Sequence, residues 1–156
     1  MGSGLKCYSF PLIRAVPKAN IQIGNRVTFG YNCTLEITKL GKLIIEDKVN
    51  ITQNVLLSCT TKITIGEATL IGENVSIRDS NHGTEKKEAI QQQSVVSEEI
   101  KIGKDVWIGA NSVVLMGSDL KDGVVIGANS LVLKSSNLSP YTIYAGSPVK
   151  KIKERI

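Results

Sequence analysis

The chain has 156 residues and a mass of 16.9 kDa, so a single domain (1–156) with a buried core is expected. Hydrophobic residues make up 42% and charged residues 21%, which argues against disorder, and no apolar run approaches the roughly 18 residues of a membrane helix. The net charge is +5 with only 4% aromatic residues, and this mild basicity without a supporting motif predicts no nucleic-acid binding.

Cysteine and histidine usage limits the chemistry further. Cys7, Cys33 and Cys59 are odd in number and form no CxxC pair, so neither a disulfide framework nor a zinc knuckle is predicted. Residues 1–10 lack the apolar stretch of a signal peptide, and a reducing cytoplasm is the expected compartment. His82 is the only histidine, so a three-histidine metal site within one subunit is excluded and no metal is expected.

In chain order, residues 1–20 are expected to be a lead-in, and residues 21–138 carry a repeat of six. Apolar residues recur at this spacing before a polar stretch at 79–99 and again after it, in the series Ile23, Phe29, Leu35; Ile45, Ile51, Leu57; Ile65, Ile71, Ile77; and Ile102, Ile108, Val114, Leu120, Ile126, Val132, Leu138. A period of six is a multiple of two and not of 3.6, which favours short extended segments over a helix.

Turn-forming residues recur inside these units, such as Asp105, Asn111, Gly117, Gly123 and Asn129. They allow a corner after every short strand, so the chain is expected to coil and to bury one aliphatic residue per strand against the neighbouring coils. The stretch 79–99 interrupts the phase and predicts a loop that protrudes from the coil, where function often resides.

The C-terminal residues 139–156 are expected to cap the coil. Ser147 followed by Pro148 is typical of a helix start, and Val149, Ile152 and Ile156 would share one face of a short helix. Such a helix would cover the core and strand edges at the open end of the coil.

Three features together resemble the hexapeptide-repeat acyltransferases, over nearly the whole chain from residue 21. They are the units IGKDVW (102–107), IGANSV (108–113) and IGANSL (126–131), the segment DSNHG (79–83), and the ending YAGSPVKKI (144–152). The resemblance implies an all-β, left-handed parallel β-helix with three six-residue faces per coil. It also implies acetyl-CoA as co-substrate, and a homotrimer with active sites between subunits.

The resemblance also assigns roles to particular residues. It makes His82 the general base, in the branch that acetylates sugars and xenobiotics, while Asp79 either orients the imidazole or caps the loop, and Asn81 contacts the acceptor. Residues expected to bind coenzyme A are Trp107, Ala110, Ala128, Lys134 and Lys150. Trp107 equally suits packing at a trimer interface, Lys134 a solvated position, and Lys150 a basic helix end.

Three functions follow from these features. The first is O-acetylation of a hydroxyl on a bacterial sugar or surface polysaccharide, such as capsule or lipopolysaccharide, by direct attack with no acyl-enzyme. The second is acetylation of an antibiotic with the same histidine. The third is a solenoid scaffold without catalysis, which failure to bind coenzyme A would support.

Overall fold

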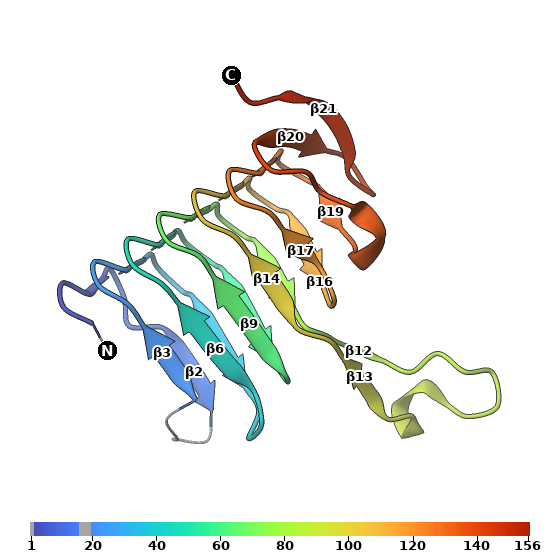
Figure 1. The fold of residues 1–156 in the computed structure, drawn as a ribbon. Helices are drawn as coiled ribbons and strands as arrows, with labels where there is room; N and C mark the ends of the chain where they lie inside the picture. The colour runs from blue at the N-terminus through green and yellow to red at the C-terminus, as the bar shows by residue number, and fades with distance from the viewer. Residues whose placement is uncertain (1, 16–19) are drawn as a thin grey trace.

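The computed structural model describes residues 2–15 and 20–156, and it is a parallel β-helix of about six turns. Three parallel sheets form the sides of the coil, the termini lie towards its two ends, and an arm projects from one corner (Figure 1). This confirms the all-β solenoid expected from the sequence, and the architecture is consistent with left-handed coiling. Within the described residues, no helix is long and apolar enough to cross a membrane.

Each turn of the coil contributes one strand to each sheet in succession. The first sheet contains β1 (Lys6–Cys7), β4 (Thr28–Phe29), β7 (Asn50–Ile51), β10 (Leu70–Ile71), β15 (Trp107–Ile108), β18 (Val125–Ile126), β20 (Thr142–Ala145) and β21 (Lys150–Glu154). The second contains β2 (Leu12–Ala15), β5 (Thr34–Ile37), β8 (Leu56–Cys59), β11 (Ser76–Arg78), β16 (Val113–Leu115) and β19 (Leu131–Val132). The third contains β3 (Ile21–Ile23), β6 (Lys42–Ile45), β9 (Lys62–Ile65), β14 (Ile100–Ile102) and β17 (Asp119–Leu120).

The six-residue series supplies the core. All seven aliphatic residues from Ile102 to Leu138 in that series are buried, as are the residues from Phe29 to Ile77 in the N-terminal half. The register matches the expected repeat of 18 residues, since Ile102 pairs with Leu120 and Ile108 with Ile126. Cys33 is buried in the same core.

Positive φ angles occur at the corners, as the turn formers predict. The corner between the first and second sheets, here called the asparagine corner, carries an asparagine at φ 55–58° in each of five turns: Asn32, Asn54, Asn74, Asn111 and Asn129. The side chain of Asn54 donates to Asn74 at 3.0 Å, and Asn74 donates to Asn111 at 2.9 Å. A Cβ on Gly109 would lie 2.6 Å from the Ala128 nitrogen, so only glycine allows these turns to stack so closely.

The N-terminal segment departs from the predicted lead-in. β1 pairs with β4 and β2 pairs with β5, so the coil begins within residues 1–20 rather than after them. Met1 and residues 16–19 of that segment lie outside the described residues. This first turn lacks the glycine-containing hexapeptide units of the later turns. Its strands form by pairing with the strands of the next turn.

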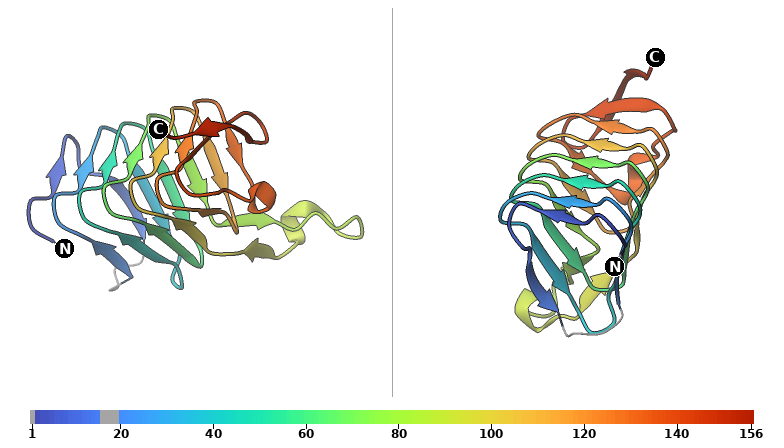
Figure 2. Two further views of the ribbon diagram at one scale, coloured as in Figure 1. Left: turned by 45° about the horizontal axis from the view of Figure 1, so that its top comes forward. Right: turned by 90° about the vertical axis from the view of Figure 1, so that its left-hand side faces the viewer.

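The predicted C-terminal helix is wrong. Residues Lys150–Glu154 form β21, which pairs antiparallel with β20 at the edge of the first sheet (Figure 2). The backbone N–H of Arg155 continues this pairing to the Tyr141 oxygen at 2.8 Å. The open edge of β20 offers unpaired backbone groups, and pairing with them outweighs the helical spacing of the apolar residues.

Candidate active site

The arm (residues 80–97) leaves the coil at the corner between the second and third sheets. Its two strands, β12 (Ser80–His82) and β13 (Val95–Ser97), pair antiparallel, and a short 3-10 helix, η1 (Ile90–Gln92), lies in the loop between them (Figure 1). None of the residues from 80 to 99 is buried in the core. The predicted loop is therefore a hairpin, with Asn81 and the exposed His82 on its first strand.

Asp79 fixes the base of the arm. Its side chain is fully buried, and its carboxylate accepts backbone hydrogen bonds from Thr60 at 2.7 Å and from Thr61 and Lys62 at 2.8 Å. The Asp79 carbonyl accepts the N–H of Glu98 at 2.9 Å, which ties the returning strand to the coil. Across the described part of the chain, no hydrogen bond joins Asp79 to His82. The hydrogen bonds of the carboxylate therefore go to the turn at residues 60–62.

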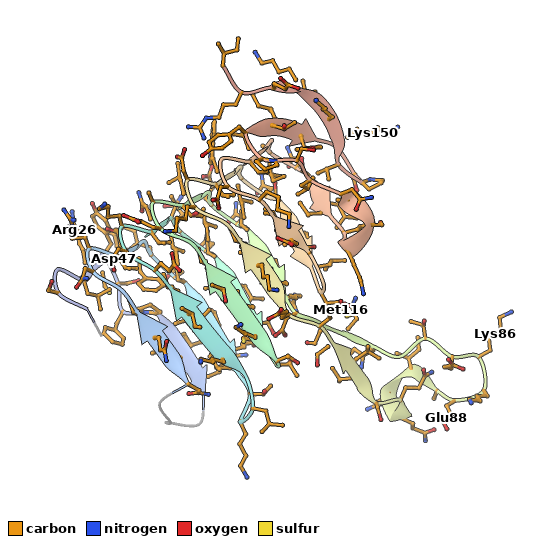
Figure 3. The ribbon with its side chains drawn as sticks, in the orientation of Figure 1. Arg26, Asp47, Lys86, Glu88, Met116 and Lys150 are labelled. Carbon is orange, nitrogen blue, oxygen red and sulfur yellow. The ribbon has the colours of Figure 1, made fainter. Side chains whose placement is uncertain are left out.

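Two adjoining clefts lie where the arm meets the coil. The arm cleft, of about 540 Å³, is lined by Asn81, His82, Gly83, Thr84, Glu85, Val96 and Met116. The lysine cleft, of about 500 Å³, is lined by Asn81, Leu115, Met116, Leu133, Lys134 and Ser135. Asn81 and Met116 belong to both, and Figure 3 shows Met116 at the base of the arm. Together the clefts connect His82 with Lys134 along one side of a single chain.

Lys134 lies in η2 (Lys134–Ser136), in the last turn of the coil. Its ammonium group is 2.7 Å from one carboxylate oxygen of Glu98 and 2.8 Å from the other. Both side chains are largely exposed, and exposed ion pairs are worth little, so Lys134 can exchange Glu98 for an anionic ligand at small cost.

The remaining predicted cofactor residues lie on the other side of the coil. Trp107 is on β15 in the first sheet, and its chain continues into the asparagine corner at Ala110, with Ala128 at the same corner one turn later. Lys150 begins β21, pairs with Ala145, and lies at the C-terminal end of that side (Figure 3). The first sheet faces away from the arm corner, so one subunit does not bring these residues to His82.

Trp107, Ala110 and Ala128 form a surface with small side chains and, within the described part of the chain, unpaired backbone donors. In the described residues, neither the Ala110 nor the Ala128 N–H donates to another protein group, and each side chain is a single methyl. Next to Trp107 in the sheet are Leu70 and Val125, and Trp107 itself is 51% exposed. The surface formed by Trp107, Ala110 and Ala128, here called the cofactor edge, therefore offers small side chains, free backbone N–H donors and an apolar face. The lysines of β21 follow it at the C-terminal end.

The two buried cysteines, Cys33 and Cys59, are poor nucleophiles. Burial, with added repulsion from the nearby Asp79 carboxylate, raises the pKa of the Cys59 thiol to about 12. Burial also raises the pKa of Cys33, whose sulfur donates to the Thr52 oxygen at 3.0 Å. A thiolate is the reactive form, so neither side chain supports a covalent acyl-enzyme.

Sequence reasoning missed several residues that line the clefts, notably Met116, Leu133 and Val96. Met116 precedes Lys134 by 18 residues, one full turn of the repeat, so the register could have placed it beside that lysine. Val96 faces the cleft only because of the hairpin pairing of the arm, which the polar composition of 79–99 does not indicate.

Comparison with known proteins gives consistent results. The bacterial transferase hexapeptide (six repeats) family model matches residues 99–134. WbbJ of Escherichia coli (strain K12), named as a lipopolysaccharide biosynthesis O-acetyl transferase, is 34% identical over 143 residues, covering 86% of this chain and 72% of the relative. A chloramphenicol acetyltransferase of Morganella morganii is 50% identical over 54 residues, or 35% of this chain and 25% of the relative.

Among solved structures, a mutant of AntD, an N-acyltransferase from Bacillus cereus in complex with dTDP and coenzyme A, superimposes with a TM-score of 0.79. It is 25% identical in sequence, and the match covers 99% of this chain and 82% of that one. The match over almost the full length of this chain shows that the two proteins share the overall fold.

Proposed function

This chain belongs to the hexapeptide-repeat acyltransferase family, and from that premise we propose that it transfers an acetyl group from acetyl-CoA to a hydroxyl group of a bacterial surface sugar. The observation that carries the proposal is the position of His82, the sole histidine, exposed in the wall of the arm cleft. The similarity to the lipopolysaccharide O-acetyl transferase of Escherichia coli over 86% of the chain supports a sugar hydroxyl as acceptor.

The residues of the first sheet and asparagine corner fit acetyl-CoA. Small side chains at Ala110 and Ala128 allow close approach of a narrow pantetheine arm, and their free N–H groups can donate to its amide or thioester oxygens. The exposed lysines of β21 suit the coenzyme A phosphates. When bound, acetyl-CoA supplies the acetyl group already activated as a thioester.

His82 then acts as the general base. A neutral imidazole accepts the proton of the acceptor hydroxyl as its oxygen bonds to the thioester carbon, the carbon–sulfur bond breaks, and the imidazolium returns the proton to the departing thiolate. Asn81, which lines both clefts, is placed to hold the acceptor by its amide. Lys134 stands in the adjoining cleft as a further cationic group for coenzyme A.

We further propose that the protein acts as a homotrimer. His82 and the group around Trp107 lie on different sides of one chain. A complete site therefore needs the first sheet of one subunit to lie against the arm side of another. The apolar residues flanking Trp107 on the first sheet support burial against a neighbouring copy. The compartment we propose is the cytoplasm, where the three free thiols would stay reduced.

The experiment that tests this function is thiol release from acetyl-CoA with a panel of acceptors. The panel contains bacterial surface glycans, nucleotide-activated sugars, simple hexoses and chloramphenicol, and mass spectrometry identifies each product as an ester or an amide. Release with glycans or sugars and ester formation are expected. Amide products, or no release although coenzyme A binds, would contradict sugar O-acetylation.

A second candidate is acetylation of an antibiotic, favoured by the 50% identity to a chloramphenicol acetyltransferase over 54 residues. That match covers 35% of this chain, against 86% for the sugar enzyme, so we rank it second. Release with chloramphenicol and not with sugars would reverse this order, and absence of coenzyme A binding would favour a scaffold.

A further inference from the structure

A third cleft lies on the outer face of the first sheet, towards the N-terminal end of the coil. This aromatic cleft has a volume of about 260 Å³ and is lined by Tyr8, Thr28, Gly30, Tyr31, Asn50, Ile51, Thr52 and Gln53. Tyr8 and Tyr31 belong to successive turns, because the Tyr8 N–H donates to the Phe29 oxygen at 2.9 Å. None of the lining side chains is charged, and none takes part in the proposed chemistry at His82.

The two tyrosines form an exposed aromatic wall. Their ring centroids are 5.7 Å apart with an interplanar angle of 44°, and each residue is 53% exposed. The Lys6 ammonium lies 4.6 Å from the centroid of the Tyr8 ring. This cation therefore covers one face of the Tyr8 ring. Among the described residues no cation lies over the Tyr31 ring, so that ring is the freer surface for a ligand.

The polar part of the lining matches sugar hydroxyls. Asn50 and Gln53 each present an amide that both donates and accepts hydrogen bonds, and Thr28 presents a hydroxyl with the same double capacity. Sugar rings combine an apolar C–H face with hydroxyl groups that donate and accept. An aromatic wall beside planar amides is complementary to both features, and the lining itself carries no charged side chain that would select an anionic ligand.

The aromatic cleft shares its face with the proposed cofactor edge. Thr28 pairs with Asn50, Asn50 with Leu70, and Leu70 with Trp107, in one continuous row across β4, β7, β10 and β15. Three steps of 4.7–4.9 Å separate Thr28 from Trp107, or about 14 Å. A single sugar cannot span that interval together with the reacting hydroxyl, whereas a glycan chain can.

We propose that the aromatic cleft is a carbohydrate-binding subsite that holds a neutral part of a glycan acceptor, away from the hydroxyl that is acetylated. The role of the cleft in acceptor selection rests on the proposed O-acetyl transfer. Sugar binding by the cleft is independent of that proposal. The subsite predicts a preference for oligomeric or polymeric acceptors over monosaccharides.

Direct binding tests the subsite independently of catalysis. The intact protein, fluorescently labelled, is applied to an array of neutral bacterial surface oligosaccharides of increasing length, alongside Tyr31→Ala and Tyr31→Phe. Phe10→Ala is the matched control, because Phe10 is 70% exposed in the same turn as Tyr8 and lies outside the cleft lining. Asn50→Ala provides a second cleft variant if Tyr31→Ala does not fold, as judged by circular dichroism.

Wild type is expected to bind the longer chains, and loss of the Tyr31 ring to weaken binding about tenfold. Tyr31→Phe, which keeps the ring, and Phe10→Ala should bind as wild type does. The proposal is overturned if wild type binds no chain, or if Tyr31→Ala and Asn50→Ala bind as tightly as wild type. It is equally overturned if Tyr31→Ala changes only the oligomeric mass measured by light scattering.

Steady-state kinetics test the subsite by a second, separate measurement. With an active acceptor, Tyr31→Ala should raise KM for the oligosaccharide and leave kcat and the monosaccharide KM unchanged. If wild type binds glycans but releases no thiol, the proposed function fails while the subsite remains.

Discussion

The carboxylate of Asp79 accepts three backbone hydrogen bonds from the turn at residues 60–62 while it is fully buried. Hydrogen bonds to a charged acceptor contribute about 1.5–3 kcal/mol each, and Asp79→Ala leaves three donors without that acceptor. We expect the variant to lose about 3 kcal/mol or more of unfolding free energy in urea titrations.

The exposed Asp119 gives a matched control, since its ion pair with Lys121 is on the surface and Asp119→Ala should cost less than about 1 kcal/mol. In Asp79→Asn the folded fraction should keep its kcat, because no hydrogen bond joins Asp79 to His82 within the described residues. A folded Asp79→Asn protein with kcat reduced by about four decades, as expected when an imidazole loses its orienting carboxylate, would assign that role instead.

Cys59 makes stability depend on alkaline pH. Its folded pKa is raised to about 12 from a reference value of 9.0, so the unfolded chain loses the thiol proton first as pH rises. The contribution to stability is therefore complete below about pH 9 and declines progressively towards pH 12. Unfolding free energy measured from pH 8 to 11 should fall more steeply for wild type than for Cys59→Ala. Parallel curves would contradict the raised pKa.

The arm is held by strand pairing and by the bonds at Asp79, and it adds nothing to the core. Replacing residues 84–93 by an Asn-Gly turn keeps His82 opposite Val95 and suits a two-residue hairpin. The melting temperature should stay close to that of wild type. Acetyl transfer should fall, because Thr84 and Glu85 are part of the arm cleft.

Two readouts separate these effects. Circular dichroism and thermal melting report the coil, and kcat/KM reports the cleft. A shortened arm with full activity would show that the outer loop is dispensable for the reaction. Unfolding of the coil would contradict the independence of arm and core.

The two ends of the chain show where sequence reasoning stops. The central series of aliphatic residues predicted strands, register and core because each unit repeats the same local pattern. At residues 149–156 the spacing of Val149, Ile152 and Ile156 fits a helix, and only the free edge of β20 selects the strand. Ile13 follows Cys7 at the six-residue spacing, but these units lack the glycine of the later repeats, and the strand at 12–15 pairs with β5. Long-range pairing is not visible in local spacing.

For the site, the sequence predicted His82, Asn81 and Lys134, and the structure brings these three to connected clefts. The spacing of residues did not show that Trp107, Ala110 and Ala128 lie on another side of the same chain, although the family resemblance implied active sites between subunits. The position of a residue around the coil follows from the register. Whether two sides meet depends on how subunits assemble, which a single sequence does not encode in its local pattern.

Considered as an assembly, the protein should show complementation between subunits. His82→Ala removes the base, and Ala128→Trp obstructs the edge proposed for acetyl-CoA, so each variant alone should be inactive. Mixed trimers, formed by refolding the two together, contain some interfaces with an intact His82 facing an intact Ala128. Activity of the mixture well above the sum of the separate variants is expected. No gain, with mixed trimers verified by native mass spectrometry, would mean that each site lies within one subunit.

The most direct test of the central claim compares wild type with His82→Ala in acceptor-dependent thiol release from acetyl-CoA, with folding and coenzyme A binding checked in both. A general base contributes about 10²–10⁴-fold, so kcat/KM of the variant should fall by at least two decades while coenzyme A affinity stays the same. Equal kcat/KM in the two proteins would contradict His82 as the base and with it the proposed mechanism.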